Sequence, residues 1–195
     1  MKKSDRTRAA ILDAARRLFA ERGYDATTVR DVAAGAGVDA ALVIRYFGNK
    51  EALFAQAAEF RLDLPDLRSV PPAKVGEVLV RHFLGIWEGP NANGGLAILL
   101  RSATSNELSA QKMRDIFGAQ VLPALSRAGG RQGAARRAGL VATQMIGLAM
   151  CRYVLKLPAI AAMPAEEVVR IVAPTVQRYL VGLDEEAKGR APARE

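Results

Sequence analysis

Two side chains in this sequence have the chemistry of a catalytic nucleophile and a general base: Cys151 is the only cysteine and His82 the only histidine. Such a pair acts in catalysis when a third group orients the base, and no motif places one beside these residues. A zinc site needs about three or four ligands, which the sequence does not supply at a suitable spacing. Dinucleotide and phosphate-loop motifs are also missing from the sequence. We therefore expect no enzymatic activity, no metal and no cofactor.

The charge favours a different chemistry, the binding of a polyanion. The net charge is +8 and the sequence pI is about 10.1, which favours nucleic acid or an acidic membrane surface as partner. Residues 1–50 hold ten Lys/Arg and six Asp/Glu, and the rest of the excess is spread over the chain, so charge alone locates no binding face. The single cysteine fits a reducing cytosol, and no apolar run is long enough to span a bilayer. We expect a cytoplasmic protein with no membrane partner.

Apolar residues recur at helical spacing along nearly the whole chain, and we find no alternating strand pattern. This predicts an all-α fold of about nine helices. A first helix is expected to start after Asp5 or Thr7 and to stop at Gly23. The later helices are predicted at Thr28–Gly35, Asp39–Phe47, Lys50–Leu62, Ala73–Trp87, Leu96–Ser105, Leu108–Leu125, Ala134–Leu155 and Ala165–Val181, the last with a kink or break at Pro174.

The second and third of these helices have the features of a helix-turn-helix. Thr28 and Asp31 form a short capping box, Gly37 breaks the helix, and Asp39 caps a helix of about two turns. In a helix-turn-helix the first helix crosses the DNA backbone, and the second enters the major groove and reads base edges. The pattern predicts that Asp39–Phe47 is such a reading helix.

The same stretch resembles the DNA-binding signature of the TetR family of bacterial transcriptional regulators, and its reading helix is similar to those of actinobacterial members. The resemblance extends over about residues 7–60. It is carried by residues 11–15 (ILDAA), 18–20 (LFA), 23–24 (GY), 27–33 (TTVRDVA), 36–38 (AGV) and 46–54 (YFGNKEALF). One departure is Ile44, where many members have a tyrosine; Arg45 or Tyr46 is expected to take over its phosphate contact.

The resemblance implies a homodimer that binds a palindromic double-stranded DNA operator, usually as a repressor, and releases it when a small-molecule effector binds. It implies an N-terminal three-helix DNA-binding domain in residues 1–50. Residues 51–195 would form a helical effector-binding and dimerisation domain, with 51–62 as a connecting helix. The alternative left open is a DNA-binding protein that is non-specific or independent of any effector.

Within the predicted reading helix, Arg45 is the candidate for bidentate contact with guanine, and Ala41 and Val43 for contact with thymine methyl groups. Arg45 could instead meet only phosphate or solvent. Lys2, Lys3, Arg6 and Arg8 form either an arm that reaches DNA or a solvated terminus. The residues expected at DNA are Thr27, Thr28, Arg30, Asp39, Ala40, Ala41, Val43, Ile44, Arg45, Tyr46 and Lys50.

The helices Ala134–Leu155 and Ala165–Val181 are apolar on several sides, which predicts either the seam of a dimer or the core of a monomer. A mixture of aromatic and polar residues suits a pocket for a hydrophobic or amphipathic effector, although the same residues could be core. The candidate effector contacts are His82, Phe83, Ile86, Trp87, Leu99, Leu100, Met113, Phe117, Gln144, Leu148 and Cys151.

Overall fold

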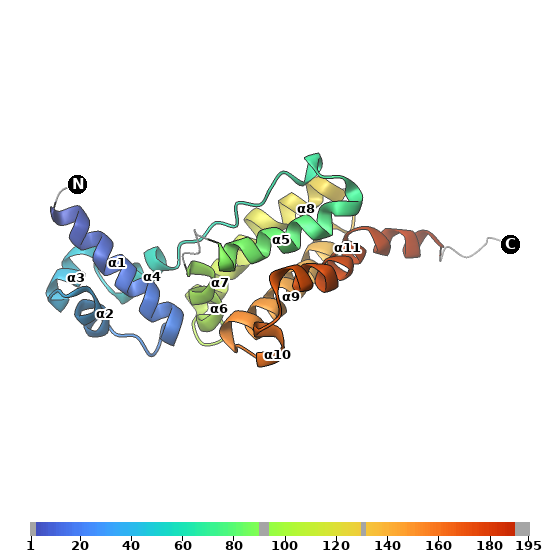
Figure 1. The fold of residues 1–195 in the computed structure, drawn as a ribbon. Helices are drawn as coiled ribbons and strands as arrows, with labels where there is room; N and C mark the ends of the chain where they lie inside the picture. The colour runs from blue at the N-terminus through green and yellow to red at the C-terminus, as the bar shows by residue number, and fades with distance from the viewer. Residues whose placement is uncertain (1–2, 90–93, 130–131, 190–195) are drawn as a thin grey trace. The chain divides into compact units, whose positions relative to one another are not determined.

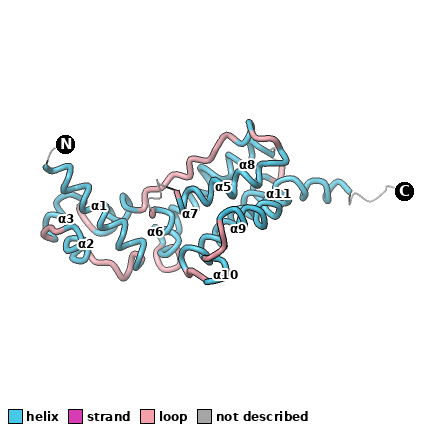
Figure 2. Tube along the Cα trace, viewed as in Figure 1, coloured by secondary structure: helices cyan, strands magenta, loops and turns pink. Residues whose placement is uncertain are grey.

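The structure, a computed structural model, describes residues 3–89, 94–129 and 132–189. Over these residues it is helical with no strand, which confirms the predicted all-α fold (Figure 2). The α-helices, labelled in Figure 1, are α1 (Lys3–Arg22), α2 (Val29–Ala36), α3 (Ala40–Phe47), α4 (Lys50–Ala57), α5 (Val75–Glu88), α6 (Gly95–Ser102), α7 (Glu107–Ile116), α8 (Leu122–Gly129), α9 (Ala134–Ala149), α10 (Pro158–Ala161) and α11 (Ala165–Gly189). Short 3₁₀ turns lie at Leu67–Ser69 and Pro72–Lys74, and π-helical turns at Phe117–Val121 and Met150–Val154.

The predicted connecting helix is wrong in its length, because α4 ends at Ala57 and the chain does not continue as a helix to Leu62. Both backbone groups of Leu62 bond to side chains instead of to the backbone of a continuing helix. Its N–H donates to the side chain of Gln120 at 2.7 Å, and its carbonyl lies 2.7 Å from His82 Nε2. These long-range contacts hold the segment after α4 in a non-helical form that local helical periodicity does not reveal.

Two other predicted helices contain π-helical turns. Leu108–Leu125 corresponds to α7, a π turn and α8, and Ala134–Leu155 corresponds to α9 and a second π turn. A wider turn shifts the helical register without ending the helix, so apolar periodicity does not signal it. Pro174 lies inside α11, which continues through it as one helix.

The chain divides into two compact units. The first comprises residues 1–61 and 93–114, and the second comprises 62–92 and 115–195. The predicted boundary at residue 50 differs from this division, because residues 51–61 and 93–114 pack with the N-terminal helices.

The first unit is built around α1, which packs against α2, α4 and α6. Its inward face carries Ile11, Leu18 and Phe19, all buried. The rings of Phe19 and Phe54 meet edge to face at 5.1 Å, and Tyr24 packs on Phe54 in the same manner at 4.9 Å. This aromatic cluster joins α1 to α4, the helix that follows the predicted reading helix.

Helix α6 belongs to this unit through polar as well as apolar contacts. The Tyr24 N–H donates to Ser102 Oγ at 3.0 Å, and the Ser105 hydroxyl donates to Asp25 at 2.7 Å. Leu99 and Leu100 are buried in the same helix. The loop between α1 and α2 is therefore held by a segment some eighty residues away in sequence.

In the second unit, α5 and α11 make the most extensive helix pair. They approach so closely at Gly76 that a Cβ there would lie 2.7 Å from the Ala173 carbonyl oxygen and 2.8 Å from Gln177 N. Gln177 also caps the start of α5: its Oε1 accepts from the Gly76 N–H at 2.8 Å, and its Nε2 donates to the Pro72 carbonyl at 2.9 Å.

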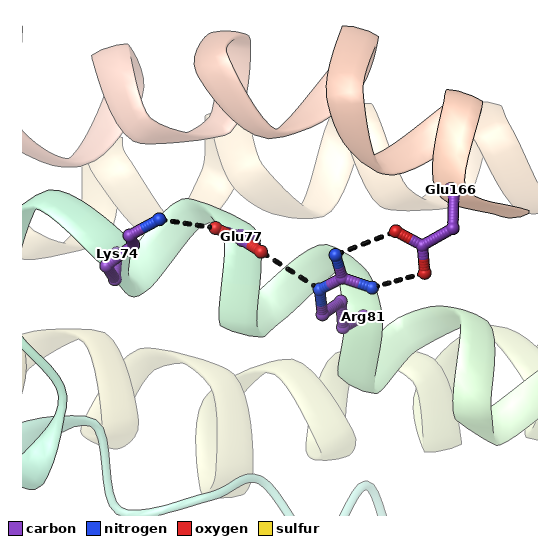
Figure 3. Close-up of polar contacts among 4 residues, drawn as sticks. All are labelled: Lys74, Glu77, Arg81 and Glu166. Carbon is purple, nitrogen blue, oxygen red and sulfur yellow. Dashed lines mark hydrogen bonds and ion pairs between the residues drawn. The ribbon is translucent and has the colours of Figure 1, made fainter.

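A chain of ion pairs runs along the exposed edge of this helix pair (Figure 3). Lys74 contacts Glu77 at 3.0 Å, and Arg81 donates to Glu77 at 3.0 Å. Arg81 also binds Glu166 of α11 with two hydrogen bonds of 2.5 and 2.8 Å. The contact with Lys74, and then that with Arg81, lowers the pKa of Glu77. Since these groups are solvent-exposed, the network orients the helices more than it stabilises them.

Among the described residues, no helix combines the length and apolar character needed to cross a membrane.

The contact at Gly76 yields a first prediction. Gly76→Ala should lower the free energy of unfolding by about 1–3 kcal/mol, because the new methyl group meets the backbone of α11, which cannot move independently. Urea denaturation measures this change. Gly85→Ala in the same helix is the matched control, since a Cβ there meets nothing within 4 Å of the described atoms. It should be neutral or stabilising by up to about 1 kcal/mol. Equal effects of the two substitutions would contradict the close packing.

Candidate nucleic-acid interface

The turn between α2 and α3 is a left-handed glycine turn. Gly37 has φ 66° and ψ 36°, a conformation that costs a residue with a Cβ more than it costs glycine. The Gly37 N–H donates to the Ala34 carbonyl and the Val38 N–H to the Ala33 carbonyl at 3.0 Å, so the end of α2 is closed by backbone hydrogen bonds. The turn therefore sets a defined angle between the two helices.

Side-chain caps begin each of the three short helices. The Thr28 hydroxyl accepts from the Asp31 N–H at 3.1 Å, Asp39 accepts from the Ala41 N–H at 2.7 Å, and Asn49 accepts from the Ala52 N–H at 2.8 Å. Helices of eight residues leave about half of their backbone groups without an intrahelical partner, so these caps are needed to define where each begins.

Thr28, expected at DNA, already uses its hydrogen-bond donors within the capping box. Its N–H and its hydroxyl both donate to the Asp31 carboxylate, at 2.8 and 2.7 Å. These hydrogen bonds lower the pKa of Asp31. A phosphate at this position has to displace the carboxylate or use other N–H groups of the first turn.

The phase of α3 determines which of its side chains face outward. Val43 and Phe47, one turn apart, are buried, with Val43 only 1% exposed. Ala41, Ile44 and Arg45 are exposed, and Ile44 is 44% exposed. Ala40 and Tyr46 are half-buried at the edges of this face.

Two residues expected at DNA are therefore misassigned. Val43 was expected to contact thymine methyl groups, and this is wrong because the helix turns its side chain into the core. Thr27 is fully buried, and its hydroxyl hydrogen-bonds the carbonyls of Gly23 at 2.9 Å and Leu18 at 3.3 Å. Its role is to close the end of α1. Arg30 and Asp39 are exposed as expected.

Lys50 is fixed at the beginning of α4 by an aromatic contact. Its ammonium lies 4.2 Å from the centre of the Tyr24 ring, and the Tyr24 hydroxyl donates to Glu51 at 3.0 Å. Burial, and then the hydrogen bond to Glu51, raises the pKa of Tyr24 to about 12. The cation is therefore held near the N-terminus of a helix, a position suited to phosphate.

Lys3, Arg6 and Arg8, for which the sequence left open a DNA-contacting arm or a solvated terminus, lie in helix α1, which begins at Lys3; Lys2 lies outside the described residues. Arg8 lies over the ring of Phe47 at 5.0 Å and donates to the side chain of Gln56. It therefore contacts the end of α3 from α1. The sequence carries no signal for this contact, since it joins residues thirty-nine positions apart.

The candidate effector residues are divided between the two compact units. Leu99, Leu100 and Met113 belong to the first compact unit, where Leu99 and Leu100 are core. The other candidates belong to the second unit: His82, Phe83, Ile86, Trp87, Phe117, Gln144, Leu148 and Cys151.

In the second unit, Trp87 is the centre of an aromatic cluster. Its ring stacks on Tyr153 at 4.6 Å with 3° between the planes, and Phe83 lies 6.3 Å from both rings. The Trp87 Nε1–H is buried and has no hydrogen-bond acceptor within the described part of the chain. Tyr153, which sequence reasoning missed, donates to Glu88 at 2.6 Å; burial, and then this hydrogen bond, raises its pKa.

An open groove of about 960 Å³ lies along α5 and α11, and none of the candidate effector residues lines it. Its walls carry the ion pairs of Figure 3. Across the described residues, no group of three or more His, Cys, Asp or Glu side chains is arranged to hold a metal.

Two family profiles match this chain. Residues 11–57 match the profile described as "Bacterial regulatory proteins, tetR family", and residues 73–180 match "Tetracyclin repressor-like, C-terminal domain". The second match alone spans more than half of the sequence.

Curated relatives match over shorter stretches. The chain is 58% identical over 45 residues to the HTH-type transcriptional repressor Rv3405c of Mycobacterium tuberculosis, which is 23% of this chain and 24% of that protein. It is 41% identical over 94 residues to the HTH-type transcriptional repressor AcnR of Corynebacterium efficiens, which is 48% and 47% of the two chains. The matches thus span between about a quarter and a half of these relatives.

A solved structure matches over nearly the whole length. It is a TetR-family regulator from Streptomyces coelicolor, 34% identical, with a TM-score of 0.54 and coverage of 92% of this chain and 97% of that one.

The phase of α3 yields a prediction that separates two adjacent residues. Val43→Ala should lower the free energy of unfolding by about 1–3 kcal/mol, because it leaves a cavity in the core. Ile44→Ala, on the exposed face, should change it by no more than about 0.5 kcal/mol. Chemical denaturation of the two variants measures the difference, and the reverse order would place Ile44 in the core.

The capping box predicts a pH dependence. Asp31 has a folded pKa below its ordinary value of 3.8, so its stabilisation is present above that pH and is lost as the pH falls through the folded pKa. Thermal unfolding from about pH 5 to about pH 2 should show a smaller loss of stability in Asp31→Asn than in the parent chain. Identical pH profiles would show that the carboxylate is not paired in the folded state.

Proposed function

The chain belongs to the TetR family of bacterial transcriptional regulators, and we propose that it is a homodimeric repressor that binds a palindromic DNA operator and releases it on binding a small molecule. The observation that carries this proposal is the capped α2–Gly37–α3 unit. Val43 and Phe47 hold α3 in place while Ala41, Ile44 and Arg45 remain exposed.

In this proposal α3 enters the major groove and the first unit supplies the phosphate contacts. Arg45 is the residue that can donate two parallel hydrogen bonds to guanine. Lys50, held over Tyr24, and the N-terminal turn of α2 contact the backbone on either side. Acting on chromosomal DNA, the protein would work in the cytoplasm.

The proposed dimer would bury apolar surface of α9 and α11. Ile146 is 41% exposed on α9 and Ile171 is 49% exposed on α11. Gly139 lies two turns before Ile146 on the same face of α9, and Gly147 follows Ile146 directly. A Cβ at either glycine would meet nothing within 4 Å of the described atoms. A stripe of small and apolar residues allows two helices to approach closely. The dimer must place its two α3 helices about 34–36 Å apart, or a multiple of this, to reach successive grooves.

The proposed effector site is the aromatic cluster of Phe83, Trp87 and Tyr153. An amphipathic molecule could stack on these rings and accept a hydrogen bond from the buried Trp87 Nε1–H. Effector binding would favour a dimer in which the spacing of the α3 helices no longer matches the operator. Since α4 ends at Ala57, this change would reach α3 through α4 and the non-helical segment after it rather than through one long helix.

The alternative is a DNA-binding protein without sequence preference or without an effector. Its binding would be dominated by phosphate contacts, its affinity would vary little among DNA sequences, and that affinity would fall steeply as the salt concentration rises. The repressor proposal predicts a preferred site bound roughly 10³-fold or more above random DNA.

The test is selection of bound duplexes from a random pool, followed by affinity measurements at several salt concentrations. We expect a palindromic winner. Arg45→Ala should weaken its binding by about 1–3 kcal/mol and relax the preference at one position of each half-site. Lys50→Ala should weaken binding to all sequences alike and make the salt dependence less steep. Failure to enrich any sequence would refute the proposal in favour of the non-specific alternative.

A further inference from the structure

The exposed face of α3 offers little hydrogen-bonding chemistry. Of its eight side chains only Arg45 and Tyr46 are polar, and Tyr46 is half-buried at the edge. The carboxylate that precedes the helix, Asp39, is used to cap it at the Ala41 N–H. The usual amide partners of adenine and acidic partners of cytosine are therefore missing from this helix.

Two exposed apolar side chains occupy the rest of that face. Ile44 is 44% exposed, and Ala41 lies one turn before it on the same side. They are about 4.5 Å apart along the helix axis, close to the rise of about 3.4 Å between stacked base pairs. Arg45 follows Ile44 directly. The face can thus cover two neighbouring base pairs with apolar surface while placing a guanidinium beside them.

The surroundings of this face favour DNA as its occupant. The helix-turn-helix carries the basic residues Arg30 on α2 and Arg45 on α3, and Lys50 begins the next helix, α4. The acidic residues of the helix-turn-helix, Asp31 and Asp39, accept hydrogen bonds from the backbone N–H groups of Thr28 and Ala41 at helix starts, which offsets their charge. An apolar face with basic residues nearby in the chain suits the DNA major groove, where base edges lie between two rows of phosphates.

The major groove presents one apolar group, the C5-methyl of thymine. We infer that Ile44, together with Ala41, reads thymine methyl groups in each half-site, beside a guanine bound by Arg45. This rests on the proposed function and deepens it: recognition depends on methyl groups at defined positions as well as on hydrogen bonds. The same reading extends to 5-methylcytosine, which carries its methyl at the same ring position.

The competing position for Ile44 is against the deoxyribose of the DNA backbone. There it would bury apolar surface without reading sequence, and a tyrosine in its place could add a hydrogen bond to phosphate. Removal of single thymine methyl groups separates the two positions, because deoxyuridine keeps every base-pairing atom and lacks only the methyl.

The experiment uses the full-length protein and the duplex obtained by selection. Each thymine is replaced by deoxyuridine, one palindromic pair at a time, and the dissociation constant is measured. We expect one or two positions per half-site at which the loss is about fourfold per methyl, corresponding to about 0.8 kcal/mol, and so about fifteenfold for the pair. Replacing such a thymine by 5-methylcytosine should cost less than replacing it by cytosine.

Variants of the protein assign the effect to a side chain. Ile44→Ala should lose most of the deoxyuridine effect at the position that Ile44 contacts, whereas a second position, read by Ala41, should keep its effect. Arg45→Ala should keep the deoxyuridine effect although it loses the guanine preference. Leu108→Ala is the matched control, because Leu108 is similarly exposed, at 48%, but lies on α7, away from the helix-turn-helix. It should behave as the parent chain does.

The outcomes separate the inference from the proposed function. A selected operator that is insensitive to deoxyuridine everywhere would overturn the thymine reading and leave the repressor intact. Tighter binding of Ile44→Tyr to all duplexes alike would also overturn the thymine reading and leave the repressor intact, because it would place residue 44 at the DNA backbone. Absence of any selected operator would remove the proposed function itself.

Discussion

The burial of Val43 and Phe47 on one side of α3 is the constraint on which the DNA-facing surface depends. A helix of eight residues is not stable alone, so its position must come from tertiary packing. Burying a valine and a phenylalanine contributes about 1.5–3 kcal/mol each, which is the main attachment available to so short a helix. Arg8 covers the Phe47 ring and connects the same anchor to α1. Since the two buried residues are one turn apart, they also fix the rotation of α3, and the remaining face is turned outward.

Side-chain caps and a glycine turn define the ends of the short helices, which packing alone does not fix. Thr28, Asp39 and Asn49 each give a side-chain oxygen to the first turn of a short helix, and Gly37 adopts the left-handed conformation between two of them. The acidic groups in this arrangement are engaged with backbone N–H groups, so they do not oppose an approaching polyanion as free carboxylates would. Stability and the electrostatics of the surface therefore come from the same hydrogen bonds.

The second unit is held together mainly by the close packing of two long helices, α5 and α11. Gly76 allows the backbones of α5 and α11 to meet, Gln177 satisfies polar groups at the start of α5, and the ion pairs centred on Arg81 align the exposed edge. Packing of this kind uses the inner face of α11, which includes Val168, Ala173 and Val176. Its outer side, with Ile171, is left for another surface, the one we assign to the second protomer.

The sequence by itself determined the helical class, the helix-turn-helix and its family, because helical periodicity, caps and glycine breaks act over a few neighbouring residues. It did not determine the phase of α3: in a run such as Ala40–Phe47 nearly every position is apolar, so Val43 and Ile44 looked equally able to face outward. The sequence also did not show where α4 ends, nor the contacts made by Arg8, Thr27 and α6. It placed Leu99 and Trp87 together among the effector candidates, although the two residues belong to different units. Only the tertiary structure decided these points. The contacts of Thr27 are local, with Gly23 and Leu18, but the others join residues distant in sequence, and the entropy lost in bringing such residues together is offset only when the core packs.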